Sequence, residues 1–151
     1  MLKNKKLIRT ILMVALAALV IIQFFQIDKT NPPVEKAQDF LAATNPPTEI
    51  TNLLKTACYD CHSHTTKYPW YTNVQPLAWW IKGHVDNGNK QLNFSTWTTY
   101  EPKKKAHKIE EMIKKVEGKE MPLLSYMVAH NDAWIDAEQR KALVDWFKTL
   151  E

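Results

Sequence analysis

Hydrophobic and polar positions divide the chain into an apolar N-terminal segment, a proline-containing segment and a longer part with helical periodicity. Residues 7–27 read LIRTILMVALAALVIIQFFQI, and an apolar stretch of about 20 residues is the length that a helix needs to cross a bilayer. Residues 28–47 contain TNPP twice, and paired prolines disfavour both helix and central strand. We therefore predict a cytoplasmic stub and single-pass transmembrane anchor at residues 1–27, followed by a linker at residues 28–47.

The remaining residues, 48–151, have the apolar spacing of short amphipathic helices, and no stretch alternates as a half-buried strand does. From Ile50 to Cys58 the apolar side chains recur at i, i+3, i+4, i+7 and i+8. This spacing predicts a helix that begins near Thr48, which can act as its cap, and that places Cys58 on the buried face.

Three further helices are expected from the same spacing and from helix start and stop signals. They are predicted at residues 76–87, ended by Gly88; at residues 102–117, ended by Gly118; and after Asp136, which forms a capping-box pattern with Gln139. Residues 48–151 are therefore expected to form one small all-α domain. Such short helices enclose little core, and a large apolar cofactor at the centre would explain how they hold together.

Charge is distributed unevenly, and this determines which partners we expect. Residues 1–27 carry four basic residues and no acidic one, so the remainder holds 16 basic and 16 acidic residues. No basic face is left to follow a phosphate backbone, and we exclude nucleic acid as a partner. The basic N-terminus places residues 28–151 on the extracytoplasmic, periplasmic side of the cytoplasmic membrane. A cleaved signal peptide, the alternative for the apolar segment, would export the same residues.

The candidate chemistry lies in Cys58, Cys61 and His62, which form a C-x-x-C-H motif and include both cysteines of the chain. Thiols at this spacing can form thioethers with the two vinyl groups of a haem, and His62 is then carried beneath the ring as the proximal iron ligand. A zinc site would need a fourth ligand, because Cys58 and Cys61 with either His62 or His64 supply only three. The cysteines of a redox-active pair usually lie at the start of a helix, whereas Cys58 and Cys61 lie at the end of the predicted one. One covalent haem c is the expected cofactor, with zinc and thiol chemistry as alternatives.

The second axial position of the iron decides whether a haem transfers electrons or binds small ligands. We expect Met121 to fill it, because Met121 lies in a turn between two predicted helices and Pro122 keeps it extended, so that the thioether can be presented to the iron. The alternatives are Met112 and Met127, which have the spacing of core residues, and the histidines His84 and His130.

The order and spacing of these motifs resemble those of a known family. The run CYDCHSHTTKYPWYTNVQPLAWWIKGHV, followed by LNFSTW, EMPLLSY, His130 and a C-terminal helix, is similar to the bacterial haem-binding domain family of membrane-anchored, cytochrome c-like proteins. The resemblance covers about residues 46–150. Two positions depart from the pattern of the family. Leu123 stands where a second proline is usual, and His64 stands where asparagine is common.

The resemblance implies a cytochrome c-like helical domain in which the first and last helices pack together. It also implies a c-type haem held by Cys58, Cys61 and His62, with Met121 as the distal ligand. We accordingly predict a membrane-anchored mono-haem cytochrome that transfers one electron to or from redox partner proteins at the membrane, as an electron carrier and not an enzyme. The alternative is a haem-based sensor or peroxidase in which the distal position is open or weakly held.

Overall fold

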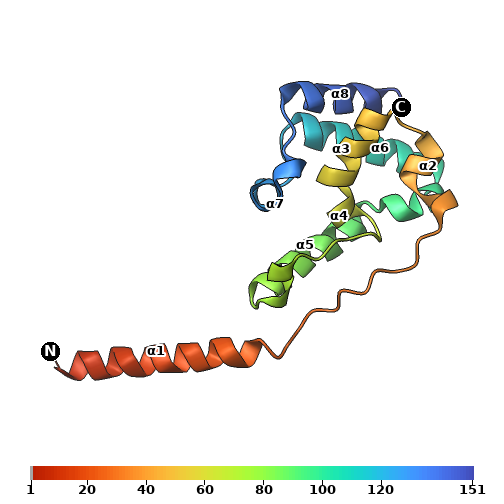
Figure 1. The fold of residues 1–151 in the computed structure, drawn as a ribbon. Helices are drawn as coiled ribbons and strands as arrows, with labels where there is room; N and C mark the ends of the chain where they lie inside the picture. The colour runs from red at the N-terminus through yellow and green to blue at the C-terminus, as the bar shows by residue number, and fades with distance from the viewer. Residues whose placement is uncertain (1) are drawn as a thin grey trace. The chain divides into compact units, whose positions relative to one another are not determined.

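The structure is a computed structural model that describes residues 2–151, and every regular element in this part of the chain is a helix (Figure 1). The all-α part of the predicted fold is therefore confirmed. The chain divides into two compact units by its internal contacts. The first comprises Met1–Thr30 and Tyr68–His84, and the second comprises Asn31–Lys67 and Val85–Glu151.

The first unit contains α1 (Leu2–Ile22), and this helix corrects the predicted transmembrane anchor. Its first turns include Lys5, Lys6 and Arg9, and it ends five residues before the predicted span does. The uncharged part, residues 10–22, spans only about 20 Å at the rise of an α-helix, against about 30 Å for the apolar core of a bilayer. Among the described residues, no helix is both long enough and apolar enough to cross a membrane. The predicted single-pass anchor, and the membrane localisation deduced from it, are therefore wrong.

The segment after α1 is joined to the second part of the first unit by hydrogen bonds to the backbone. The side-chain amide of Gln23 donates to the carbonyl of Gln75 (3.0 Å), and its oxygen accepts from the Gln75 N–H (2.9 Å). The indole N–H of Trp79 donates to the carbonyl of Phe25 (3.0 Å). This part of the unit contains the 3-10 helix η2 (Trp70–Asn73) and the start of α5 (Leu77–Gln91).

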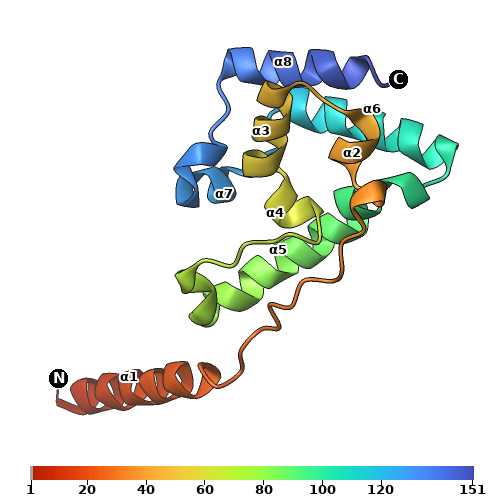
Figure 2. The same ribbon diagram turned by 45° about the vertical axis from the view of Figure 1, so that its right-hand side comes forward.

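The second unit holds the C-x-x-C-H motif and the remaining helices. In chain order these are η1 (Lys36–Gln38), α2 (Phe40–Thr44), α3 (Thr48–Ala57), α4 (Tyr59–His62), the end of α5, η3 (Phe94–Thr99), α6 (Pro102–Glu117), α7 (Leu124–Ala129), η4 (Asn131–Ala133) and α8 (Ala137–Lys148). Both views show α3, α6 and α8 side by side (Figures 1 and 2). The contact between α3 and α8 agrees with the packing of first and last helices that the resemblance implies.

The core of the second unit forms where the apolar stripes of α3, α6 and α8 meet the aromatic residues of α2 and η3. Phe40 is completely buried at its centre, with its ring centroid 4.9 Å from that of Phe94 and 4.8 Å from that of Trp97. Phe40 belongs to α2, a helix inside the predicted linker that sequence analysis did not find. Part of the segment at residues 28–47 therefore contributes to the core.

The boundaries of α6 and α8 confirm the sequence patterns from which they were predicted. α6 ends before Gly118, and α8 begins with a capping box in which the Asp136 carboxylate accepts from the Gln139 N–H (2.8 Å) and the Gln139 side chain accepts from the Asp136 N–H (3.0 Å). α3 begins at Thr48 as predicted, but its N-cap is Pro47, and Thr48 is the first helical residue. α5 does not end at Gly88: it continues to Gln91.

Candidate functional site

The C-x-x-C-H motif folds into one helical turn. α3 ends at Ala57, and Cys58, with φ −128° and ψ −41°, breaks the helix before α4 begins. The carbonyl of Cys58 then accepts from the N–H groups of Cys61 (3.2 Å) and His62 (3.0 Å). The two cysteines are therefore three residues apart across this turn, and Cys61 is close enough to Cys58 to raise the pKa of its thiol. Cys58 is partly buried and lies one residue beyond the end of α3, although the predicted helix included it, and neither cysteine forms a disulfide.

The imidazole of His62 is partly buried, and its hydrogen bonds show which ring nitrogen carries a hydrogen. Its Nδ1 lies 3.0 Å from the carbonyl oxygen of Gly88 and 3.1 Å from that of Leu92. Carbonyl oxygens only accept hydrogen bonds, so Nδ1 must carry a hydrogen. Burial lowers the pKa of His62, and the two carbonyls oppose this shift. The ring is therefore neutral at physiological pH, with Nε2 available to a metal ion.

Gly88 brings the end of α5 against the motif. A Cβ at this position would lie 2.4 Å from the carbonyl oxygen of Cys61 and 3.2 Å from the Cys61 Cβ. Because only glycine allows this approach, the Gly88 carbonyl can reach the His62 imidazole. The prediction that Gly88 ends the helix was therefore wrong for a physical reason. Gly88 allows the backbone of α5 to contact the backbone of Cys61. This contact cannot be recognised from the position of Gly88 in the sequence.

Alanine at Gly88 should lower the free energy of unfolding by about 2–4 kcal/mol, because α5 must move away from Cys61 and the hydrogen bonds to His62 are lost. Chemical denaturation followed by circular dichroism measures this change. Gly83→Ala on the same helix is the matched control, since no atom lies within 4 Å of its added Cβ. It should raise the stability by up to about 1 kcal/mol. Equal effects of the two substitutions would contradict the role assigned to Gly88.

Both thiols are protonated at neutral pH. Burial raises the pKa of Cys58 to about 12, with a smaller contribution from Cys61, and burial together with the charge of Asp60 raises the pKa of Cys61 to about 11. Reactive redox cysteines have a lowered pKa, which is the opposite shift. Among residues 2–151 no three His, Cys, Asp or Glu side chains are grouped so that they could hold a metal ion. The structure therefore supports neither the thiol-exchange alternative nor the zinc alternative.

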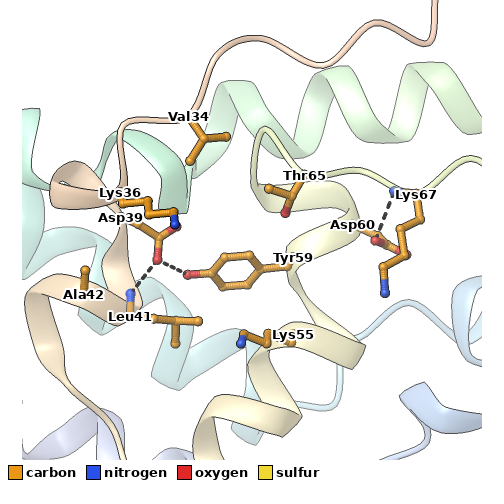
Figure 3. Close-up of a pocket in the computed structure, with 10 residues that line it drawn as sticks. All are labelled: Val34, Lys36, Asp39, Leu41, Ala42, Lys55, Tyr59, Asp60, Thr65 and Lys67. Carbon is orange, nitrogen blue, oxygen red and sulfur yellow. Dashed lines mark hydrogen bonds between the residues drawn. The ribbon is translucent and has the colours of Figure 1, made fainter.

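The two residues between the cysteines connect α4 to other parts of the second unit. The Tyr59 hydroxyl donates to the Asp39 carboxylate at the start of α2 (2.9 Å), and Asp60 accepts from the backbone N–H of Lys67 (3.2 Å) and from the hydroxyl of Tyr126 (2.8 Å). Figure 3 shows Tyr59 pointing to Asp39 across a pocket of about 440 Å³, with Asp60 at its far side. These hydrogen bonds of Tyr59 and Asp60 were not predicted from the sequence. The C-x-x-C-H motif does not indicate hydrogen-bond partners that are distant along the chain.

Met121 lies outside this turn, between α6 and α7, where it is partly buried against the core. Its N–H donates to the carbonyl of Lys115 (3.1 Å), and its carbonyl accepts from Nη1 of Arg140 (2.8 Å). The same Arg140 nitrogen donates to the carbonyl of Val116 (2.6 Å) at the end of α6. The backbone of Met121 is therefore fixed on both sides, while its thioether takes no part in these bonds.

The other candidate ligands are engaged elsewhere or belong to the core. Met112 and Met127 are buried, as their spacing predicted. Nδ1 of His130 lies 3.0 Å from the carbonyl of Tyr126, and the two rings stack at 4.1 Å. In the first unit, Nδ1 of His84 lies 2.9 Å from the carbonyl of Trp80. Each histidine has an Nδ1 contact within its own helical turn.

Comparison with known proteins identifies the family. The model of a family described as a haem-binding domain matches residues 17–149, most of the chain. The chain belongs to the haem-binding domain family. Haem is accordingly the cofactor of this domain. No curated protein and no solved structure matches the chain.

The residues of the haem-binding domain fit this cofactor. A haem iron needs a neutral imidazole with a free nitrogen. Burial favours the neutral form of His62, and the carbonyls of Gly88 and Leu92 place its hydrogen on Nδ1. Two free thiols belong to the turn that leads to His62. A zinc ion, by contrast, would find no group of three His, Cys, Asp or Glu ligands in the part of the chain that the structure describes. The donor set at Cys58, Cys61 and His62 is therefore suited to haem.

Proposed function

We propose that the haem-binding domain is a mono-haem, c-type electron carrier. In this proposal Cys58 and Cys61 hold the haem through thioether bonds, and His62 and Met121 are the axial ligands of its iron. The observation that carries the proposal is the pair of carbonyl contacts to His62 Nδ1, directly after two free thiols. They place the ring hydrogen on Nδ1, and in the neutral ring that burial favours Nε2 is then free. When bound in this way, a haem supplies a one-electron couple between ferric and ferrous iron.

The residues around His62 would orient it for this task. A metal-binding histidine commonly donates its other N–H to a carbonyl or carboxylate, which fixes the ring orientation and makes the bound nitrogen a stronger donor. The carbonyls of Gly88 and Leu92 provide such acceptors at 3.0 and 3.1 Å. Both come from the end of α5 and the residue after it, so the close contact at Gly88 is part of the same arrangement.

Met121 is the distal ligand in this proposal because its backbone is fixed and its thioether is uncommitted. Lys115 and Arg140 hold the N–H and the carbonyl of Met121, so little conformational freedom remains to be lost on binding. Axial methionine raises the reduction potential of a haem and, by filling the sixth position, denies it to small ligands. These properties suit electron exchange with redox partner proteins and not substrate turnover.

The test of the proposed function is the full-length protein produced together with a c-type haem attachment system. Haem colour should stay with the chain on a denaturing gel, and the intact mass should increase by that of one haem. The oxidised protein should show a sulfur-to-iron charge-transfer band. A colourless band on the gel would exclude covalent attachment. Fast carbon monoxide binding to the reduced protein would instead favour a sensor or peroxidase with an open distal position.

A further inference from the structure

We propose that Tyr126 is a positioning residue that holds the Met121 side of the iron site against the C-x-x-C-H turn through its hydrogen bond to Asp60. This inference rests on the proposed function, since it concerns how firmly Met121 stays on the iron. It assigns a role to a residue that carries no ligand atom and that no sequence motif marks.

The hydrogen bond of Tyr126 joins the two elements that carry the proposed iron ligands. Its hydroxyl lies 2.8 Å from Oδ2 of Asp60 and 3.1 Å from the carbonyl oxygen of Thr56. Asp60 lies between Cys58 and Cys61, so the hydroxyl bonds to the turn that holds the proximal ligand. Tyr126 itself lies in α7, which begins three residues after Met121.

The acceptor side of this contact is held in place. Oδ1 of Asp60 accepts from the backbone N–H of Lys67 (3.2 Å), which leaves Oδ2 for the Tyr126 hydroxyl. Both carboxylate oxygens of Asp60 therefore have a donor, and the side chain cannot rotate away without losing both bonds. Figure 3 shows the bond between Asp60 and the Lys67 N–H.

The donor side is equally fixed within its own segment. The N–H of Tyr126 donates to the carbonyl of Leu123 (3.0 Å), and its ring stacks on His130 with centroids 4.1 Å apart and planes inclined by 22°. Burial, and to a smaller extent the charge of Asp60, raises the pKa of Tyr126, so the hydroxyl stays protonated and can donate. Movement of this side chain would therefore move the segment that follows Met121.

α7 has little else to keep it docked. It is six residues long, and its apolar contacts come from the buried Met127 and the partly buried Tyr126. A hydrogen bond to a charged acceptor is stronger than one between neutral groups. The Tyr126 hydroxyl is therefore the main polar contact between α7 and the turn that carries His62. When this contact is absent, the segment should leave the iron more often.

The test measures how fast carbon monoxide replaces Met121 on the reduced protein, with full-length, haem-loaded chains. Tyr126→Phe should bind carbon monoxide roughly tenfold to a hundredfold faster than the wild type, the range expected for loss of one hydrogen bond to a charged group. It should also weaken the charge-transfer band of the oxidised form. Tyr59→Phe is the matched control. It removes the same kind of tyrosine–aspartate bond from the same turn, but that bond leads to α2 and not to α7.

The outcomes separate the inference from the proposed function. A wild-type band with equal carbon monoxide rates in Tyr126→Phe and wild type would overturn the inference alone. Equal acceleration by Tyr126→Phe and Tyr59→Phe would also overturn it, because general loosening would then be the cause. A wild type that lacks the band would instead overturn methionine ligation. If Tyr126→Phe does not fold, Asp60→Asn replaces it, and a wild-type rate in that variant counts against the inference.

Discussion

Alanine at both Cys58 and Cys61 should remove all haem colour from the chain on a denaturing gel. Thioether bonds survive denaturation, whereas the bond between His62 and iron does not, so covalent attachment depends on the two thiols alone. The native variant should still take up added haem weakly, because burial favours a neutral His62 and the carbonyls of Gly88 and Leu92 orient its ring. Haem-stained gels, combined with native absorption spectra, measure the two properties separately.

The single variants provide the control for this experiment. Cys58→Ala and Cys61→Ala each leave one thiol, so each should keep part of the colour, at a lower yield than the wild type. Both cysteines are free in the structure, and no disulfide is lost in any of the three proteins. Colour that persists in the double variant would show that the attachment does not use these thiols.

Alanine at Met121 should abolish the sulfur-to-iron charge-transfer band of the oxidised protein and open the reduced iron to carbon monoxide. The band requires a thioether on ferric iron, and alanine offers no atom that can replace it. The surrounding backbone should persist, since Lys115 and Arg140 bind the N–H and carbonyl of residue 121 and not its side chain. Absorption spectra and flash-photolysis rates of carbon monoxide rebinding measure both effects.

Met127→Leu is the control for this substitution. Met127 is buried, and a leucine of similar volume should cost less than about 1.5 kcal/mol while the band is kept. If Met121→Ala keeps the band and Met127→Leu loses it, the distal ligand has been assigned to the wrong methionine. If both variants keep the band, Met112 becomes the next candidate, whereas a wild type without the band would favour a histidine such as His130.

Local signals predicted α6 and α8 well because they are contained in the helices themselves. The spacing of Ile109, Met112, Ile113 and Val116 marks the buried stripe of α6, and all four side chains are buried. The capping box at Asp136 fixes the first turn of α8 through atoms three residues apart. Such signals do not depend on the rest of the fold, so the all-α class followed from the pattern.

The N-terminal helix shows the limit of a hydrophobicity pattern. Apolar character continues to Ile27, but α1 ends at Ile22, and the chain then makes hydrogen bonds to residues some 50 positions further on, such as that between Gln23 and Gln75. Where a helix ends can depend on contacts of this kind, which composition does not contain. α2 was missed for a similar reason: Phe40 is recognisable as a core residue only once the helices around it are in place.

The sequence by itself determined which residues are candidates for the haem site. The C-x-x-C-H motif contains two thiols and an imidazole at fixed spacing, and Met121 is the methionine that lies outside any apolar stripe of a predicted helix. Both features can be read from residues that are close together in the sequence. Only the tertiary structure decided how these groups are held. The hydrogen on His62 is set by carbonyls 26 and 30 residues away, and the Tyr126 hydroxyl meets Asp60 across 66 residues. Such contacts arise when helices pack, so no local pattern could have contained them.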